Sequence, residues 1–176
     1  MREGVLRIAH MDAKRSIPLA LVVLLFAASS FVRSAVYQTE VTLYSDIVAK
    51  SPGKARPHNN LGHALKEAGR IPEAAAQLEQ ALEIKPDYPD ALNNLGTIYS
   101  STGRREEGLE LLSRALQFNP GHLQARYNLA MQYYENGMIP EAEREYQLLI
   151  QLAPQSKEAV FAYKMLAMIN RSRSSR

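Results

Sequence analysis

The sequence predicts an all-α protein, in which a solenoid of helix–turn–helix units follows an apolar, membrane-type helix. Three observations lead to this prediction: a short phrase recurs every 34 residues, a glycine closes each copy, and prolines recur at the same interval. A period of this length is typical of helical hairpins that stack side by side. One hairpin is too small to bury its own apolar face, so neighbouring hairpins share a core.

The recurring phrase can be followed directly in the sequence. Asn-Asn-Leu-Gly occupies residues 59–62 and again residues 93–96, and Tyr-Asn-Leu-Ala occupies residues 127–130. The punctuating residues keep the same register, and they are Gly69, Gly103, Gly137, Pro52, Pro86, Pro120 and Pro154. Three copies in register therefore divide most of the chain into equal units.

Each unit carries the signals of two helices. A glycine can adopt the left-handed conformation beyond a helix C-terminus at little cost, so each closing glycine ends a first helix. Pro72 and Pro140 then suit the first turn of the second helices. Small residues such as Gly62 and Ala74 let the two helices approach closely, and larger ones such as Leu65 and Leu78 fill the space between them.

In chain order, the sequence predicts eight segments of different character. These are a basic segment (1–15), a transmembrane or signal-anchor helix (16–35), a degenerate half repeat (36–54), three full repeats (55–88, 89–122 and 123–156), a C-terminal capping helix (157–170) and a basic, disordered tail (171–176).

The apolar run at residues 17–32 contains no charged residue. As a helix it would span about 24 Å, and extension to Tyr37 with a snorkelling Arg33 would match a hydrocarbon core of ~30 Å. We favour a membrane anchor through residues 17–37, and a cleaved signal peptide or a buried core helix remain alternatives. Four basic residues precede the run, so the positive-inside rule places the N-terminus in the cytoplasm. The repeats would then lie outside the cytoplasm, in the periplasm if the protein is bacterial.

The last predicted helix, residues 157–170, begins after Ser156, which is a suitable N-cap. It has few polar residues for a helix that would cap a solenoid. Its apolar residues Phe161, Met165 and Met168 either cover the last repeat or contact another molecule, including a second copy of the chain.

Composition and charge exclude several functions. The chain carries a net charge of +3, but the two basic ends account for more than this, and residues 16–170 carry −2. Such a core has no basic stripe for nucleic acid. There is no cysteine, and His58 and His63 are five residues apart rather than the four that would place two metal ligands on one helical face. We therefore expect no enzyme activity, no cofactor and no metal.

The repeat pattern resembles that of the tetratricopeptide repeat (TPR) family over residues 36–170. It reads Leu61-Gly62…Leu65…Gly69…Ala74…Leu78…Ala81…Pro86, with Leu95-Gly96…Tyr99…Gly103…Gly108…Leu112…Ala115…Pro120 and Leu129-Ala130…Tyr133…Gly137…Ala142…Tyr146…Leu149…Pro154 as the later copies. The departures are His58, Leu92 and Arg126 where the family prefers Trp, and Gly108 where it prefers Ala. A glycine inside a helix is expected to cost about 1 kcal/mol relative to alanine. The resemblance implies a right-handed α-solenoid whose first helices line a concave groove.

Asn60, Asn94 and Asn128 precede the Leu of each copy and should stack as a ladder along that groove. An amide side chain offers a donor and an acceptor, which match the peptide unit of an extended ligand, as in a similar asparagine row of the O-linked N-acetylglucosamine transferases. Alternatively, these asparagines satisfy local backbone groups or a neighbouring loop. The other predicted peptide-binding residues are Arg56, Asn59, His63, Lys66, Asn93, Thr97, Tyr127, Met131 and Tyr134.

These features predict a membrane-anchored protein-interaction module that binds an extended peptide or protein segment. The groove runs from basic to aromatic, which favours a ligand with acidic and apolar ends. The carboxylate clamp of some TPR proteins is not expected, since Gln124 and Asn128 replace its basic residues. Residues 34–62 also resemble, loosely, the junction between membrane helix and TPR tail in bacterial glycosyltransferase-type membrane proteins. Two alternatives are thus an accessory subunit or tail of such an enzyme or envelope assembly complex, and a self-associating scaffold.

Overall fold

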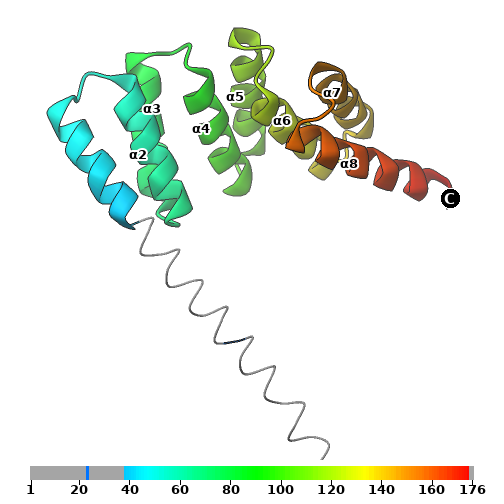
Figure 1. The fold of residues 1–176 in the computed structure, drawn as a ribbon, viewed down its shortest axis with the longest axis horizontal. Coiled ribbons are helices and arrows are strands. Elements are labelled where there is room, and N and C mark those ends of the chain that lie inside the picture. The colour runs from blue at the N-terminus through cyan, green and yellow to red at the C-terminus, as the bar shows by residue number, and fades with distance from the viewer. Residues whose placement is uncertain (1–22, 24–37, 175–176) are drawn as a thin grey trace, which may run out of the picture.

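The computed structural model describes residue 23 and residues 38–174. Within residues 38–174 the chain is all helical, with no strand, and its helices are joined by short turns (Figure 1). A helix over residues 38–50 is followed by α2 (Ala55–Glu67), α3 (Ile71–Ile84), α4 (Pro89–Ser101), α5 (Arg105–Phe118), α6 (Leu123–Glu135), α7 (Ile139–Leu152) and α8 (Lys157–Ser174).

The turns between paired helices form as the glycine and proline spacing predicts. Gly69, Gly103 and Gly137 have φ angles of +76°, +90° and +75°, the left-handed conformation in which a side chain is strained. Pro72 and Pro140 lie in the first turns of α3 and α7. Ser156 caps α8, because its hydroxyl accepts a hydrogen bond from the Ala159 amide at 3.1 Å.

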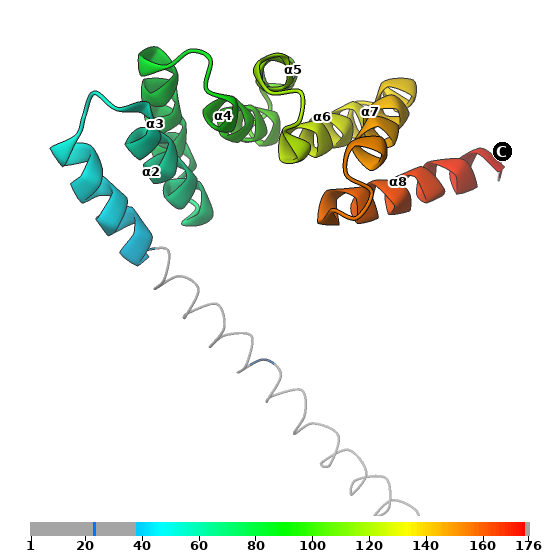
Figure 2. The same ribbon diagram turned by 45° about the horizontal axis from the view of Figure 1, so that its top comes forward.

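The helices stack in consecutive pairs, and each second helix also contacts the next first helix. The first helices contact one another in the order α2, α4, α6 and α8, whereas among α2–α8 no two second helices are in contact. The array therefore curves toward its first helices, which form the inner row of the arc seen in Figure 2. We call the surface of this row the inner face.

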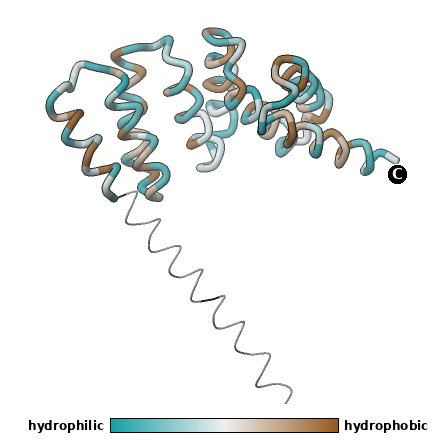
Figure 3. Tube along the Cα trace, viewed as in Figure 1, coloured by the Kyte–Doolittle hydropathy of each residue, from teal (hydrophilic) through white to brown (hydrophobic). Residues whose placement is uncertain are grey.

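The core runs along the array in two clusters, one between Val41 and Ala125 and the other in α6, α7 and α8. Apolar segments recur on every helix (Figure 3), and the largest fully buried side chains are spread over four helices. They are Leu78, Leu92, Leu112, Tyr146 and Leu149. This distribution is what stacked hairpins require, since each buries its apolar face against its neighbours.

At two of the positions where the family prefers Trp, His58 and Arg126 make equivalent contacts with the second helix and with the preceding proline. His58 contacts the side chain of Gln77 at 2.8 Å and the carbonyl oxygen of Pro52 at 2.9 Å. Arg126, 68 residues further on, donates to Glu145 at 2.5 Å and to the Pro120 carbonyl at 2.8 Å. The residues that His58 and Arg126 contact are also two repeat periods apart: Gln77 corresponds to Glu145, and Pro52 to Pro120. The same contact between paired helices is therefore made with different side chains. The middle repeat places Leu92 and Leu111 at these positions, and both are buried.

Gly108 stands one repeat after Ala74, at a position where a small residue is expected to let the two helices of a unit approach closely. A Cβ atom at this position would meet Ser100 Oγ and would lie 2.8 Å from the Gly96 carbonyl oxygen. Glycine is therefore required by the close approach of α4 and α5. Helix propensity is outweighed here by packing.

The C-terminal tail is also a correction. Residues 171–174, which we expected to be disordered, continue α8 to Ser174. Arg173 reaches Glu143 on α7 at 2.7 Å, and the Ser172 hydroxyl donates to the Ile169 carbonyl at 2.7 Å. Basic residues in the last turn also interact favourably with the helix dipole.

The predicted basic segment (1–15) and membrane helix (16–35) lie outside the described residues, apart from Val23. In the part of the chain that the structure describes, no helix has the length and apolar character needed to span a membrane.

Candidate functional site

Asparagine side chains join the first helices to one another along the inner row. Nδ2 of Asn94 on α4 donates to Oδ1 of Asn59 on α2 at 3.1 Å. Nδ2 of Asn128 on α6 donates to Oδ1 of Asn93 on α4 at 2.8 Å. Each bond spans one repeat plus one residue, and we call this chain of contacts the amide row.

The amide row bears directly on the predicted ladder. Asn60, Asn94 and Asn128 do lie at equivalent places on successive first helices, but each is already engaged in hydrogen bonding. Asn94 and Asn128 each donate one amide hydrogen to the preceding repeat, and Oδ1 of Asn128 accepts from Gln124 at 3.1 Å. Asn60 makes only a long contact, accepting from Asn59 at 3.4 Å. Asn60 consequently keeps the most hydrogen-bonding capacity for a ligand.

Sequence reasoning missed the link between repeats, although a signal was present. The first asparagine of each Asn-Asn doublet, Asn59 or Asn93, accepts from the following unit, and in the second doublet Asn94 also donates to the preceding unit. The structure shows Asn59 and Asn93 to be 7% and 6% exposed, so these two are buried acceptors rather than open surface. They stabilise the stacking of repeats, because a buried amide needs a partner.

A pocket of about 260 Å³ opens at the α2 end of the row. It brings Asn59, Asn60 and His63, three predicted residues, together with Glu40 and Tyr44 from the helix over residues 38–50. Sequence reasoning did not find the last two, because nothing in the half repeat's pattern marked them as neighbours of Asn60.

Arg56 and Lys66, predicted to provide positive charge, also lie on α2 but do not line this pocket. Arg56 is exposed. Lys66 is partly buried, with its ammonium group 3.6 Å from the carboxylate of Glu67.

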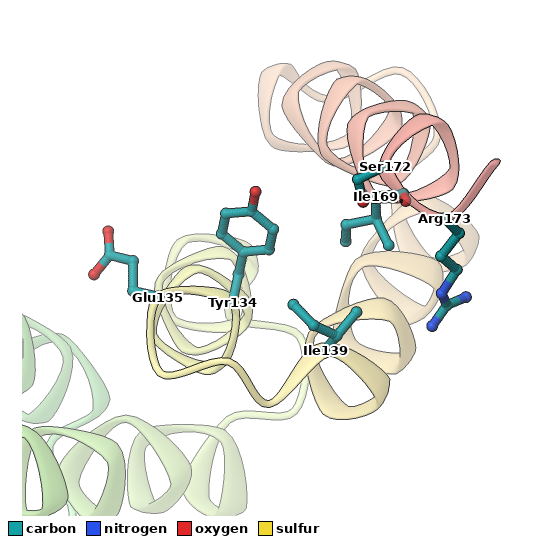
Figure 4. Close-up of a pocket in the computed structure, with 6 residues that line it drawn as sticks. All are labelled: Tyr134, Glu135, Ile139, Ile169, Ser172 and Arg173. Carbon is teal, nitrogen blue, oxygen red and sulfur yellow. Dashed lines mark hydrogen bonds between the residues drawn. The ribbon is translucent and has the colours of Figure 1, made fainter. Parts of the chain in front are cut away.

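A larger pocket, of about 530 Å³, lies at the other end, between α6, α7 and α8. Tyr134, Ile139 and Ile169 come from these three helices and border a common space (Figure 4). Glu135 and Arg173 stand on opposite sides of it. Of the predicted residues only Tyr134 is here, because the remaining walls depend on how α8 docks.

The other predicted residues near the C-terminal end take part in packing. The ring of Tyr127 lies 6.4 Å from that of Tyr146 and 5.9 Å from that of Phe161, which joins α6 to α7 and α8. Burial raises the pKa of Tyr127. Met131 packs against the apolar cluster that contains Tyr146. Thr97, further from the C-terminal end on α4, donates its hydroxyl hydrogen to the Asn94 carbonyl at 2.8 Å.

The described residues contain no group of histidine, aspartate and glutamate side chains that could hold a metal ion. The first helices offer side-chain amides and a line of partly exposed residues, and they border two pockets that each have polar and apolar lining residues. Such a surface is suited to binding a partner.

Comparison with known families agrees with this geometry. A family model described as "TPR repeat" matches residues 62–103, and another described as "Tetratricopeptide repeat" matches residues 101–166. Together they cover more than half of the chain. The chain belongs to the tetratricopeptide repeat family. Both models begin at or after residue 62, so neither covers the junction that resembles glycosyltransferase-type membrane proteins.

Solved structures show the same fold at low sequence identity. TTC0263, a thermophilic TPR protein in Thermus thermophilus, has a TM-score of 0.68 at 21% identity and matches over 76% of this chain and 74% of its own. The first TPR of Spaghetti (RPAP3), bound to the HSP90 peptide SRMEEVD, has a TM-score of 0.63 at 18% identity over 69% and 94%.

Two structures of the MamA protein are also similar. One has a TM-score of 0.62 at 17% identity over 80% of this chain and 92% of its own, and the other 0.59 at 20% identity over 68% and 65%. This TPR chain thus spans just under two thirds of the second MamA chain. No curated protein matches the sequence.

Proposed function

We propose that this TPR protein binds an extended segment of a partner protein along its inner face, while its apolar N-terminal segment holds the repeats at a membrane. The observation that carries the proposal is the alignment of the amide row between two pockets, one containing Asn60 and the other Tyr134. An extended chain laid along first helices would meet both pockets and the remaining amide groups between them.

The chemistry of the two ends favours a ligand of mixed character. At the α2 end, Arg56, His63 and Lys66 favour acidic side chains, whereas Glu40 inside the pocket disfavours a carboxylate there. Acidic residues of the ligand are therefore expected over the exposed part of α2. At the other end, Tyr134, Ile139 and Ile169 favour an apolar side chain of the size of leucine or phenylalanine.

The similarity to a TPR domain bound to an HSP90 peptide supports peptide binding as the class of function. That peptide, SRMEEVD, is acidic at its end. The present chain has Gln124 and Asn128 on α6, where the clamp of some TPR proteins needs basic residues, so a different ligand is expected.

Synthetic peptides test the proposal. A panel of labelled ten-residue peptides with acidic residues at one end and leucine or phenylalanine at the other, in both orders, would be titrated against the full chain in detergent by fluorescence anisotropy. We expect micromolar binding that exceeds binding of scrambled and charge-reversed peptides. His63→Ala and Tyr134→Ala should each weaken it five- to tenfold, and Lys85→Ala, on an exposed turn away from both pockets, should not. Equal binding of scrambled peptides, or no effect of both substitutions, would reject the proposal.

Membrane attachment is tested separately. The chain should remain in the membrane fraction after carbonate extraction, and deletion of residues 16–35 should release it. Mass spectrometry of the mature N-terminus distinguishes an anchor, which retains residues 16–35, from a cleaved signal peptide, which loses them. Recovery of the intact chain in the carbonate supernatant would contradict the anchor.

A further inference from the structure

We propose that α8 of one copy pairs with the helix over residues 38–50 of a second copy, so that two chains join head to tail through a shared fourth helix pair. Both helices present a face that is buried in every complete repeat and is more exposed in these two. The proposal does not depend on peptide binding, and it names the surface that would receive α8.

The open face of α8 is identified by the 34-residue register. In the third repeat, Arg126 and Ala130 pack against residues of α7, and these two and Leu129 are buried. The residues 34 positions later are Val160, Tyr163 and Lys164. Val160 is 49% exposed, Tyr163 is 53% exposed and Lys164 is also exposed. No helix of the described residues covers this face, so among them α8 is a first helix without a paired second helix.

The helix over residues 38–50 corresponds to a second helix, and the face that a second helix turns toward its paired first helix is more exposed in it. In the first repeat, Ala74 and Leu78 lie against Gly62 of α2, and both, like Ala81, are fully buried. The residues 34 positions earlier, Glu40, Tyr44 and Ile47, are only partly buried. Leu43, equivalent to Gln77, is 54% exposed. The pocket lined by Glu40, Tyr44 and Asn60 lies where a preceding first helix would stack. Among the described residues, this helix is therefore a second helix without a paired first helix.

The two open faces are complementary at the positions that form the joints of complete repeats. The joint made by His58 with Gln77 and by Arg126 with Glu145 corresponds to Val160 and Leu43 in the proposed pair. Both are apolar, as are Leu92 and Leu111 at the same positions of the second repeat.

Charge complementarity is found at the closest approach of the helices. In the first repeat this point is formed by Gly62 and Ala74, where a Cβ on Gly62 would lie 3.2 Å from the Ala74 carbonyl oxygen. The corresponding residues of the proposed pair are Lys164 and Glu40. Opposite charges meet where two small residues meet elsewhere, and an ion pair shielded by Val160 and Leu43 would form.

The larger side chains also set the strength of the contact. Lys164 and Glu40 hold the two helices further apart than glycine and alanine do, so the intermolecular pair is looser than the pairs within one chain. Because the contact joins different surfaces, it leads to open chains or rings rather than to a closed two-fold dimer. We therefore expect reversible, concentration-dependent association.

A charge-swap series tests the proposal on the full chain in detergent by sedimentation velocity, with the detergent contribution subtracted. The unmodified chain should associate as its concentration rises toward about 100 µM, an affinity typical of a small interface. Glu40→Lys alone and Lys164→Glu alone should each weaken association at least tenfold. The double variant Glu40→Lys/Lys164→Glu should restore it, and so should an equimolar mixture of the two single variants. Arg144→Glu, an exposed change of equal charge on α7, should leave association unchanged.

Cysteine cross-linking supplies an independent readout, because the chain contains no cysteine of its own. A mixture of Glu40→Cys and Lys164→Cys chains, mildly oxidised, should yield a mixed disulfide dimer. A mixture of Glu40→Cys with Arg144→Cys should yield far less.

Three outcomes would overturn the proposal: a monomer throughout the concentration range, association that ignores both charge reversals, or equal cross-linking in the two mixtures. Peptide binding by the dilute chain should be unaffected by Lys164→Glu, so failure of this proposal and failure of the proposed function are distinguishable.

Discussion

Arg126 and Glu145 form an ion pair between α6 and α7, with Nη1 of the arginine 2.5 Å from Oε2 of the glutamate. Their side chains are only 11% and 16% exposed. His58 and Gln77 make the equivalent contact in the first repeat, and Leu92 and Leu111 hold the equivalent positions in the second. The contact between paired helices is therefore made by an ion pair, by a hydrogen bond between histidine and glutamine, or by two leucines. In each repeat the two residues of the pair are of the same kind.

The matching requirement can be measured on Arg126 and Glu145. Arg126→Leu alone leaves a mostly buried carboxylate without its cation and should lower the free energy of unfolding by about 3 kcal/mol. Arg126→Leu/Glu145→Leu recreates the apolar pair of the second repeat and should recover most of that loss. Urea denaturation of Arg126→Leu, Glu145→Leu and the double variant gives the coupling free energy. Additive losses would show that the two residues do not act as a pair.

Gly108 provides a second prediction. Gly108→Ala improves the helix propensity of α5 by about 1 kcal/mol, but the added methyl group collides with Ser100 and the Gly96 backbone. Overpacking of this kind costs about 1 to 3 kcal/mol, so the variant should be less stable, not more. Thermal denaturation measures the sign. Gly53→Ala is the control, since a Cβ there meets nothing within 4 Å and should change stability little.

Tyr146 gives a prediction about alkaline pH. Its hydroxyl is buried with no hydrogen-bond partner among the described residues, and burial raises its pKa above the usual value of about 10. Above pH 10 the unfolded chain loses this proton and the folded chain keeps it, so stability falls as pH rises further.

Tyr146→Phe should remove that part of the alkaline loss and, near pH 7, raise the free energy of unfolding by about 1 kcal/mol, because an unpaired buried hydroxyl is removed. Denaturation midpoints at pH 8 and pH 11 test both statements. Tyr163→Phe, at an exposed tyrosine and low protein concentration, is the matched control. An unchanged pH dependence in Tyr146→Phe would contradict the assignment.

The amide row predicts that stability and binding can be separated. Asn93→Ala removes the acceptor of Asn128 at a buried position and should lower the free energy of unfolding by about 1 kcal/mol. Asn60→Ala breaks only a contact of 3.4 Å and should leave stability nearly unchanged, while weakening peptide binding severalfold. Denaturation and peptide titration of both variants check this. A loss of stability in Asn60→Ala as large as in Asn93→Ala would show that Asn60 is structural.

Some elements follow from local chemistry, and others do not. The ends of the helices around Gly69, Gly103 and Gly137 are predictable, because a positive φ angle is a property of one residue in one turn. The repeat register marks Gly108 as a small residue, but that not even a Cβ atom fits there depends on the distance between two helix backbones. The pocket around Asn60 likewise needs Glu40 and Tyr44, which lie on another helix and carry no recognisable motif.

By itself the sequence determined the repeat length, the family and the alternation of first and second helices, since these depend on periodicity and on residues that stop helices. The tertiary structure alone decided which asparagines join repeats, how far α8 extends and which two helix faces no other helix of the described residues covers. Those properties arise from contacts between residues about 20 to 35 positions apart or on separate helices. Such contacts exist only once the hairpins have stacked, because a shared core belongs to the array and not to any single repeat.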